Sequence, residues 1–180
     1  MSNIIFISGT PCTGKTTIGE QLSQKLDWDL VKINDLAISN NSVLGIDEDK
    51  GYKIIDIDAL DGDLSDIISS SDNLIVEGHL SHLCSGADKV IVLRCRPEIL
   101  EKRLALRNYS DAKIHENLEA EALGVCSAES LEIYQNNVYE LDVSDLSIDE
   151  VVSILFDVIE GKRELTFGEI DFMDWLLTHQ

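Results

Sequence analysis

Basic residues are scarce in this sequence. Its 180 residues contain 14 lysines and arginines against 34 aspartates and glutamates, which gives a formal net charge of -20. An anionic surface of that size repels phosphate backbones and anionic lipids, so we expect neither direct nucleic-acid binding nor membrane-surface binding. The charge favours basic protein partners, although a salt-rich cytosol selects acidic surfaces as well. The excess of acidic residues therefore indicates either a basic protein partner or a salt-rich habitat.

Long apolar runs and paired cysteines are also absent. No run approaches the ~18–20 residues of a membrane span. The N-terminus lacks the basic segment of a signal peptide, so we expect a first strand there. The cysteines give no sign of a zinc site or a redox dithiol, because no C-x-x-C pair occurs, and a reduced, cytoplasmic location fits best. They are Cys12, Cys84, Cys95 and Cys126.

Apolar runs and helical patterns alternate along the chain. The length corresponds to one domain, at ~100–200 residues per domain. Short β-rich runs separated by longer stretches of helical periodicity predict an α/β fold, a doubly wound parallel sheet with helices on both faces. Residues 40–51 are predicted to be a polar loop and residues 52–58 to be extended chain. The expected strands are 4–8, 29–33, 74–76, 90–93 and 138–143, and the expected helices include 15–26, 60–68, 97–107 and 147–159.

The first strand is followed by a phosphate-binding motif. Residues 9–16 match G-x-x-x-x-G-K-[ST] between a buried strand and an amphipathic helix, which is the context the motif requires. Backbone N–H groups and the helix N-terminus favour phosphate there. Lys15 is expected to bridge the β- and γ-phosphates of ATP, Thr16 to ligate Mg²⁺ and Thr17 to reach the α-phosphate. The expected nucleotide-binding residues are Gly9, Cys12, Thr13, Gly14, Lys15, Thr16 and Thr17.

Two polar residues follow the strand predicted at 74–76. Glu77 ends this apolar run, and ligands bind at the carboxyl ends of parallel strands. We therefore expect Glu77 to hold the water shell of Mg²⁺ together with Thr16, with a surface charge as the plainer alternative. His79 is a candidate catalytic residue that orients an attacking water or contacts a monophosphate, although a lone histidine is often structural.

The arginines are few and clustered. The chain has five, and four of them lie within residues 94–107. Arg103 and Arg107 are four residues apart and share one helix face. Phosphoryl transfer needs cations around the migrating group, and arginine suits bidentate phosphate contact. Arg107 and Arg103 are therefore candidate ATP contacts, and pairing with Glu98 or Glu101 on a solvated helix is the alternative.

Three segments together resemble a known family. Gly9–Thr17 (GTPCTGKTT), the Glu77–His79 segment and residues 103–117 are similar to the adenylate kinase isoenzyme 6 (CINAP-type) family, above all to its archaeal members. The tail over residues 168–175 resembles the C-terminal G-x-I-D-W segment of that family. The likeness covers nearly the whole chain, although only the phosphate loop is specific by itself.

The resemblance implies a P-loop NTPase fold in a single domain over residues 1–180. It also implies a nucleoside-monophosphate-binding excursion at about 30–53 and a short lid at about 106–116 that brings Arg107 to ATP. The implied activity is that of a broad-specificity nucleoside monophosphate kinase, ATP + AMP ⇌ 2 ADP with Mg²⁺, accompanied by ATPase activity. The implied partners are AMP and a basic small-subunit ribosomal protein, through a link to maturation of the small ribosomal subunit.

Two departures keep other functions open. The family usually has glycine where Cys12 stands, and residues 30–53 contain no arginine to clamp a monophosphate. Lys32, Lys50 or Lys53 could substitute as point charges. One alternative is an ATP-switched ribosome assembly factor with little kinase activity. Another is a small-metabolite kinase of the shikimate or gluconate type, which shares the loop and the size.

Overall fold

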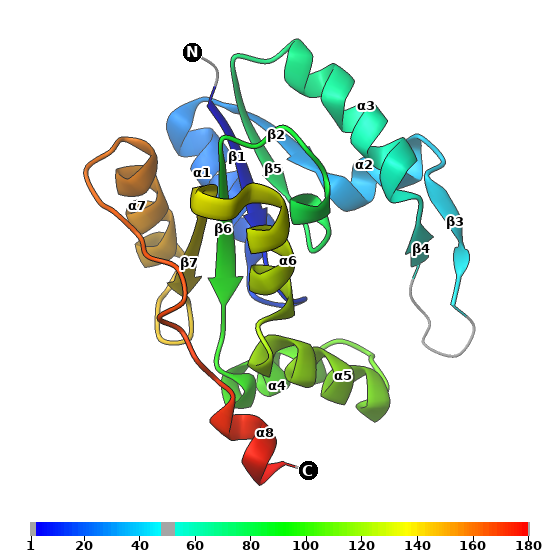
Figure 1. Ribbon diagram of the computed structural model, residues 1–180, viewed down its shortest axis with the longest axis vertical. Coiled ribbons are helices and arrows are strands. Elements are labelled where there is room, and N and C mark those ends of the chain that lie inside the picture. The colour runs from blue at the N-terminus through cyan, green and yellow to red at the C-terminus, as the bar shows by residue number, and fades with distance from the viewer. Residues whose placement is uncertain (1–2, 48–52, 180) are drawn as a thin grey trace.

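A parallel sheet forms the centre of the protein (Figure 1). The computed structural model describes residues 3–47 and 53–179. Within these ranges the strand order of the main sheet is β2–β5–β1–β6–β7, and all neighbouring pairs run parallel. All the carboxyl ends of the strands therefore meet at one edge. The strands are β1 (Asn3–Ser8), β2 (Asp29–Lys32), β5 (Asn73–Glu77), β6 (Lys89–Arg94) and β7 (Val138–Asp142).

The central strand β1 shows how both faces of the sheet are covered. Successive side chains of a strand point to opposite sides. Accordingly Ile5 and Ile7 join one apolar cluster, whereas Ile4 and Phe6 join another. The doubly wound sheet with helices on both faces is confirmed. One cluster packs against α1 (Lys15–Leu26) and α7 (Ile148–Ile159), and the other against α2 (Ile33–Ser39), α3 (Ile57–Ser69) and α6 (Val125–Tyr134).

Two further helices lie beyond the carboxyl edge of the sheet. Helix α4 (Pro97–Ala105) begins with proline, which tolerates the first turn because its missing N–H would have no helical partner there. Helix α5 (Asp111–Ala122) begins after Ser110, whose side chain accepts a hydrogen bond from the N–H of Lys113. The two helices pack against each other, and Figure 1 shows them below the ends of β1 and β6.

An antiparallel hairpin projects from the main body on the side of α2 and α3 (Figure 1). It consists of β3 (Val43–Ile46) and β4 (Lys53–Ile55). The loop predicted at 40–51 is therefore wrong at 43–46, where no side chain is fully buried and so no buried face marks the strand, and its residues 48–51 lie outside the described residues. The extended chain predicted at 52–58 ends early, since the side chain of Asp56 caps α3 through the N–H of Ala59.

The tail after α7 returns along the edge of the sheet. The carbonyl oxygen of Thr166 accepts a hydrogen bond of 2.9 Å from the N–H of Glu140 in β7. Further on, α8 (Asp174–Thr178) packs against α5 and buries Trp175. The remaining short helical turns are η1 (Ser81–Leu83) and η2 (Gln135–Asn137). Over the described ranges, none of the helices is both long enough and apolar enough to cross a membrane.

Candidate nucleotide-binding site

The loop between β1 and α1 has the backbone of a phosphate cradle. Gly9 and Gly14 have φ angles of 137° and 98°, and a Cβ on Gly9 would lie 2.4 Å from the carbonyl oxygen of Leu93. Cys12 also takes the left-handed region, at φ 69°. A residue with a side chain is strained there, which gives a physical reason for glycine at this position in the family that the chain resembles.

The Lys15 side chain lies inside this loop. Its Nζ donates to the carbonyl oxygens of Gly9 and Thr10, both at 2.8 Å. Burial lowers the pKa of Lys15, while acidic neighbours that include Cys126 and Glu77 oppose the shift. The ammonium group is thus held at the N-terminus of α1, where N–H groups already favour an anion.

Thr16 and Glu77 meet beside the lysine. The Thr16 hydroxyl donates to Oε1 of Glu77 at 3.1 Å, and Glu77 is only 5% exposed at the end of β5. Burial raises the pKa of Glu77, against the effects of the Thr16 hydrogen bond and the Lys15 charge. A hydroxyl and a carboxylate are the oxygen ligands that Mg²⁺ takes from proteins, which leave its other positions to water and phosphate. The pair therefore fits the metal expected with a nucleotide.

Glu77 and Thr16 are not part of a larger metal cage. In residues 3–47 and 53–179 there is no group of three or more His, Cys, Asp or Glu residues placed to hold a metal ion. Mg²⁺ in nucleotide sites commonly takes only one or two protein oxygens.

His79 contacts the backbone of the loop and is not among the residues that line the cavity. Its Nδ1 is 3.1 Å from the carbonyl oxygen of Gly9, a contact that places the ring proton on Nδ1 and leaves Nε2 as an acceptor. Burial and the nearby charge of Lys15 lower the pKa of His79 to about 4. The ring is therefore neutral near pH 7.

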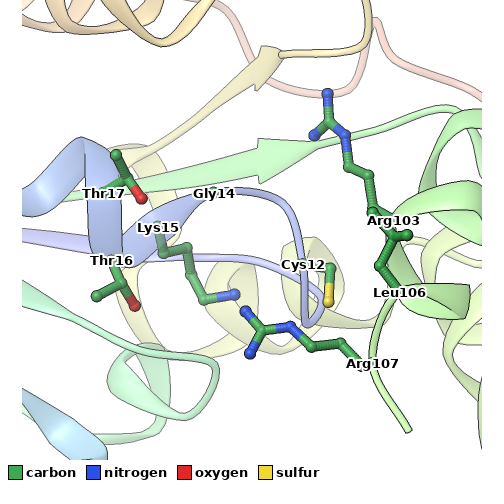
Figure 2. A pocket seen from close by; sticks show the side chains of 8 residues that line it. All are labelled: Cys12, Gly14, Lys15, Thr16, Thr17, Arg103, Leu106 and Arg107. Carbon is green, nitrogen blue, oxygen red and sulfur yellow. The ribbon is translucent and has the colours of Figure 1, made fainter. Parts of the chain in front are cut away.

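A cavity of about 310 Å³ opens at the loop (Figure 2). Figure 2 shows the guanidinium of Arg107 turned toward Lys15 and Cys12, whereas Arg103 extends away from them. Nη2 of Arg103 reaches the carbonyl oxygen of Val143 at 3.5 Å. The structure thus brings most of the sequence-predicted residues to one cavity. Its lining residues are Cys12, Gly14, Lys15, Thr16, Thr17, Arg103, Leu106 and Arg107.

The other predicted residues lie next to that lining. Thr13 is buried, and its hydroxyl donates to the carbonyl oxygen of Thr10 at 3.0 Å. Gly9, Glu77 and His79 contact lining residues or the loop backbone instead of the cavity. Sequence reasoning missed Thr10, which stands at an unspecified position of the motif and has no local signal of its own.

Comparisons with known proteins show the family of this chain. A family model described as "AAA domain" matches residues 5–124. A protein of Methanothermobacter thermautotrophicus named "Putative adenylate kinase" is 41% identical over 97% of this chain and 99% of its own. A protein of Halobacterium salinarum with the same name is 37% identical over 96% and 99%. This chain belongs to that archaeal family. The resemblance found in the sequence is therefore confirmed.

Solved structures support the fold of this family member. Shikimate kinase from Acinetobacter baumannii, in complex with shikimate, superposes with a TM-score of 0.64 at 12% identity and covers 91% of this chain and 96% of its own. The YorR protein of Bacillus subtilis, in complex with phosphorylated GDP, gives a TM-score of 0.55 at 19% identity and covers 88% and 96%. At such identities the likeness concerns the fold alone, and together with the family model it confirms the P-loop α/β class.

Proposed function

We propose that this protein is a nucleoside monophosphate kinase that catalyses ATP + AMP ⇌ 2 ADP, with broad acceptor specificity and an accompanying ATPase activity. One observation carries the proposal: Lys15 and Arg107, from elements far apart in the sequence, face the same cavity at the N-terminus of α1. Such a pair suits a migrating phosphoryl group, which is anionic. The names of the archaeal relatives support the same activity.

In this mechanism the loop binds the phosphates and the cations stabilise the transition state. Lys15 leaves the carbonyl oxygens of Gly9 and Thr10 and binds the β- and γ-phosphates. Thr16 and Glu77 would hold Mg²⁺, which when bound neutralises phosphate charge. Arg107 stabilises the charge on the transferred group. Positioning and charge carry phosphoryl transfer, so no general base is assigned for the kinase reaction.

His79 is proposed to contact the molecule that receives the phosphoryl group. Because it is neutral and donates from Nδ1 to Gly9, its Nε2 can accept a hydrogen bond from water. In the ATPase reaction this nitrogen would orient the attacking water. The same nitrogen would accept from a protonated group of an acceptor in the kinase reaction.

A second candidate function rests on the residues expected to bind the acceptor monophosphate. Residues 30–53 contain no arginine, and Lys32 is already paired with Glu20. Lys53 is exposed on the arm, and Lys50 lies outside the described residues. A weak clamp for a monophosphate favours an ATP-switched assembly factor with little kinase activity. Its basic small-subunit ribosomal partner comes from the family resemblance, and its cytoplasmic setting comes from the absence of a C-x-x-C pair.

A coupled assay separates these functions. ADP production is measured with Mg-ATP and, in turn, AMP, CMP, UMP, GMP, shikimate or water alone. The kinase proposal expects ADP formation to rise strongly with AMP and less with the other monophosphates. If ADP production with every acceptor equals the rate with water alone, the kinase proposal is wrong and the ATP-switched assembly factor remains. A response to shikimate alone would assign the site to a metabolite kinase.

A further inference from the structure

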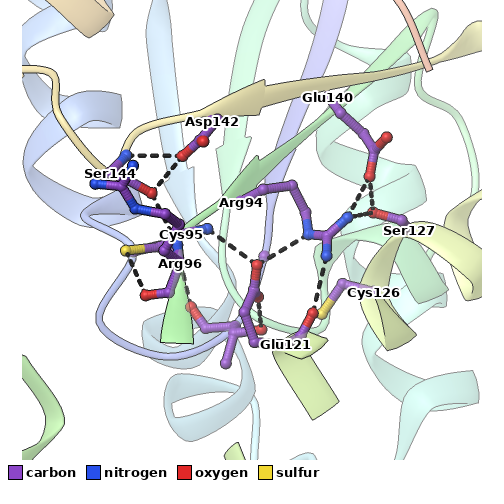
Figure 3. A network of polar contacts seen from close by, with 12 residues as sticks. Arg94, Cys95, Arg96, Glu121, Cys126, Ser127, Glu140, Asp142 and Ser144 are labelled. Carbon is purple, nitrogen blue, oxygen red and sulfur yellow. Dashed lines mark hydrogen bonds and ion pairs between the residues drawn. The ribbon is translucent and has the colours of Figure 1, made fainter. Parts of the chain in front are cut away.

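Figure 3 shows a buried cluster of charges around Arg94. This cluster connects the phosphate loop with the tail. Arg94, at the end of β6, donates from Nε to Oε1 of Glu121 at 2.9 Å and from Nη1 to Oε1 of Glu140 at 2.6 Å. Its Nη2 also donates to the backbone oxygen of Glu121 at 2.8 Å. These three side chains are 2–5% exposed. Two carboxylates thus share one guanidinium out of contact with water.

Such a cluster is poorly explained by stability alone. Removing charges from water costs free energy that the attraction between them often fails to recover, and apolar replacements of buried ion pairs are frequently neutral or stabilising. The second oxygens of the two carboxylates have different partners. Oε2 of Glu140 accepts from the N–H of Gly168 in the tail, at 2.8 Å, whereas Oε2 of Glu121 accepts from the hydroxyl of Thr10 in the phosphate loop.

The place of Glu121 in its helix also needs an explanation. It stands in the last turn of α5, a turn without a basic residue. The C-terminal end of a helix carries partial negative charge, so a carboxylate there is locally unfavourable. Contacts outside the helix therefore hold Glu121 in place, and Thr10 is among them. The same helix begins four residues after Arg107, so α5 joins the region of this arginine to the base of the loop.

Several hydrogen bonds of the phosphate loop meet at Thr10. Its carbonyl oxygen accepts from Nζ of Lys15 at 2.8 Å and from the hydroxyl of Thr13 at 3.0 Å. The N–H of Thr13 also donates to it, at 3.4 Å. A side chain that is fixed by Glu121 fixes the direction of this peptide group. The loop is then shaped before any phosphate arrives, which removes an ordering cost from binding.

We propose that Glu121 is a positioning residue for nucleotide binding, which acts through its hydrogen bond with Thr10 to hold the phosphate loop in its binding conformation. The proposal rests on the proposed nucleotide-dependent function of the same loop. It assigns the phosphates of a nucleoside di- or triphosphate as the ligand that gains from this contact. Glu140, which shares Arg94 but contacts the tail, serves stability instead.

The decisive variants change the hydroxyl of Thr10. Thr10→Val has nearly the same shape without the donor, and Thr10→Ser keeps the donor. Calorimetry with Mg-ADP as the probe is expected to give a Kd about tenfold higher for Thr10→Val, the scale of a lost hydrogen bond to a charged group. Thr10→Ser should bind within about threefold of the unmodified protein, which a purely steric role of the threonine would not produce.

Two carboxamide variants provide the matched comparison. Glu121→Gln is expected to raise the Kd for Mg-ADP like Thr10→Val, and Glu140→Gln to lower Tm while leaving the Kd within about twofold. The proposal is overturned if Thr10→Val binds as well as the unmodified protein, or if Glu140→Gln weakens binding as much. Failure of the unmodified protein to bind Mg-ADP would instead overturn the proposed function, and this inference with it.

Discussion

The phosphate loop and the β3–β4 arm are built in opposite ways. In the loop, Lys15 and Thr13 are buried and hydrogen-bonded to the backbone. On the arm, Leu44, Ile46 and Ile54 are 68%, 63% and 47% exposed. The loop is thus held by buried contacts to its own backbone, whereas the arm has little packing.

The difference lies in how firmly the rest of the protein holds each segment. The strands of the arm pair only with each other within the described residues, and an isolated hairpin is marginally stable. Its base is fixed, because the N–H of Ser42 donates to Ala37 and the N–H of Asp56 to Ser42. The phosphate loop is therefore held by the core of the protein, whereas the arm is held mainly at its base, and a role of the arm in acceptor choice stays a proposal.

The largest expected effect comes from removing the ammonium group of the loop. Lys15→Ala should reduce phosphoryl transfer below detection, because the charge that bridges the phosphates is lost. The fold should persist, since β1 and α1 keep their apolar contacts. Turnover and Tm are the measurements. Lys25→Ala, at the exposed end of the same helix, is the control and should retain activity; normal turnover in folded Lys15→Ala would refute the site.

The next prediction tests whether the region after α4 contributes to the same cavity at the phosphate loop. Arg107→Ala is expected to lower kcat by about 100-fold, with a smaller change in ATP affinity, because charge stabilisation in the transition state is lost. Steady-state kinetics and direct ATP titration measure the two quantities. Arg96→Ala is the matched control, because Arg96 pairs with Asp145 outside the cavity. A change restricted to KM would reassign Arg107 to ground-state binding.

Cysteine labelling reports on how accessible Cys12 is in the cavity at the phosphate loop. Cys12 is partly exposed and lines the cavity, whereas Cys84, Cys95 and Cys126 are buried. Iodoacetamide should therefore modify Cys12 at least about tenfold faster than the others, and Mg-ATP should protect it because thiol reactivity requires access. Mass spectrometry of the modified peptides gives the rates. Equal rates at all four cysteines, or no protection, would contradict the placement of Cys12 at the phosphates.

The smallest effect is expected on the arm. Leu44→Ser should change the free energy of unfolding by less than about 0.5 kcal/mol, because the side chain is already in water. Leu64→Ala, a buried position in α3, should cost about 2–5 kcal/mol through the cavity that it leaves. Urea denaturation measures both. A large loss for Leu44→Ser would mean that the arm is packed in solution, and the contrast with the loop would disappear.

The sequence was sufficient for the parts of the molecule with local patterns. Continuous apolar runs identified the buried strands, and the motif at residues 9–16 identified the turn from β1 to α1. Ser147 and Glu150 form the capping box that starts α7, as the residue types indicate. These features depend on neighbours in the chain, which is why they could be predicted.

Contacts between distant residues could not be predicted in this way. Thr10 and Glu121 are 111 residues apart, and no periodicity relates them. The arginine cluster at 94–107 divides in space as well, since Arg94 is buried in ion pairs while Arg107 is exposed beside the cavity. The roles of the excursion at 30–53 and of the lid at 106–116 stay predictions.

The hydrogen bond between Thr166 and Glu140 also has a consequence for solubility. β7 is an edge strand, and an unpaired edge is a template for intermolecular strand pairing and aggregation. The returning tail takes up an edge N–H of β7 and thereby blocks this template. A chain shortened before residue 166 would leave that N–H unpaired, so we expect it to self-associate more readily than the full chain.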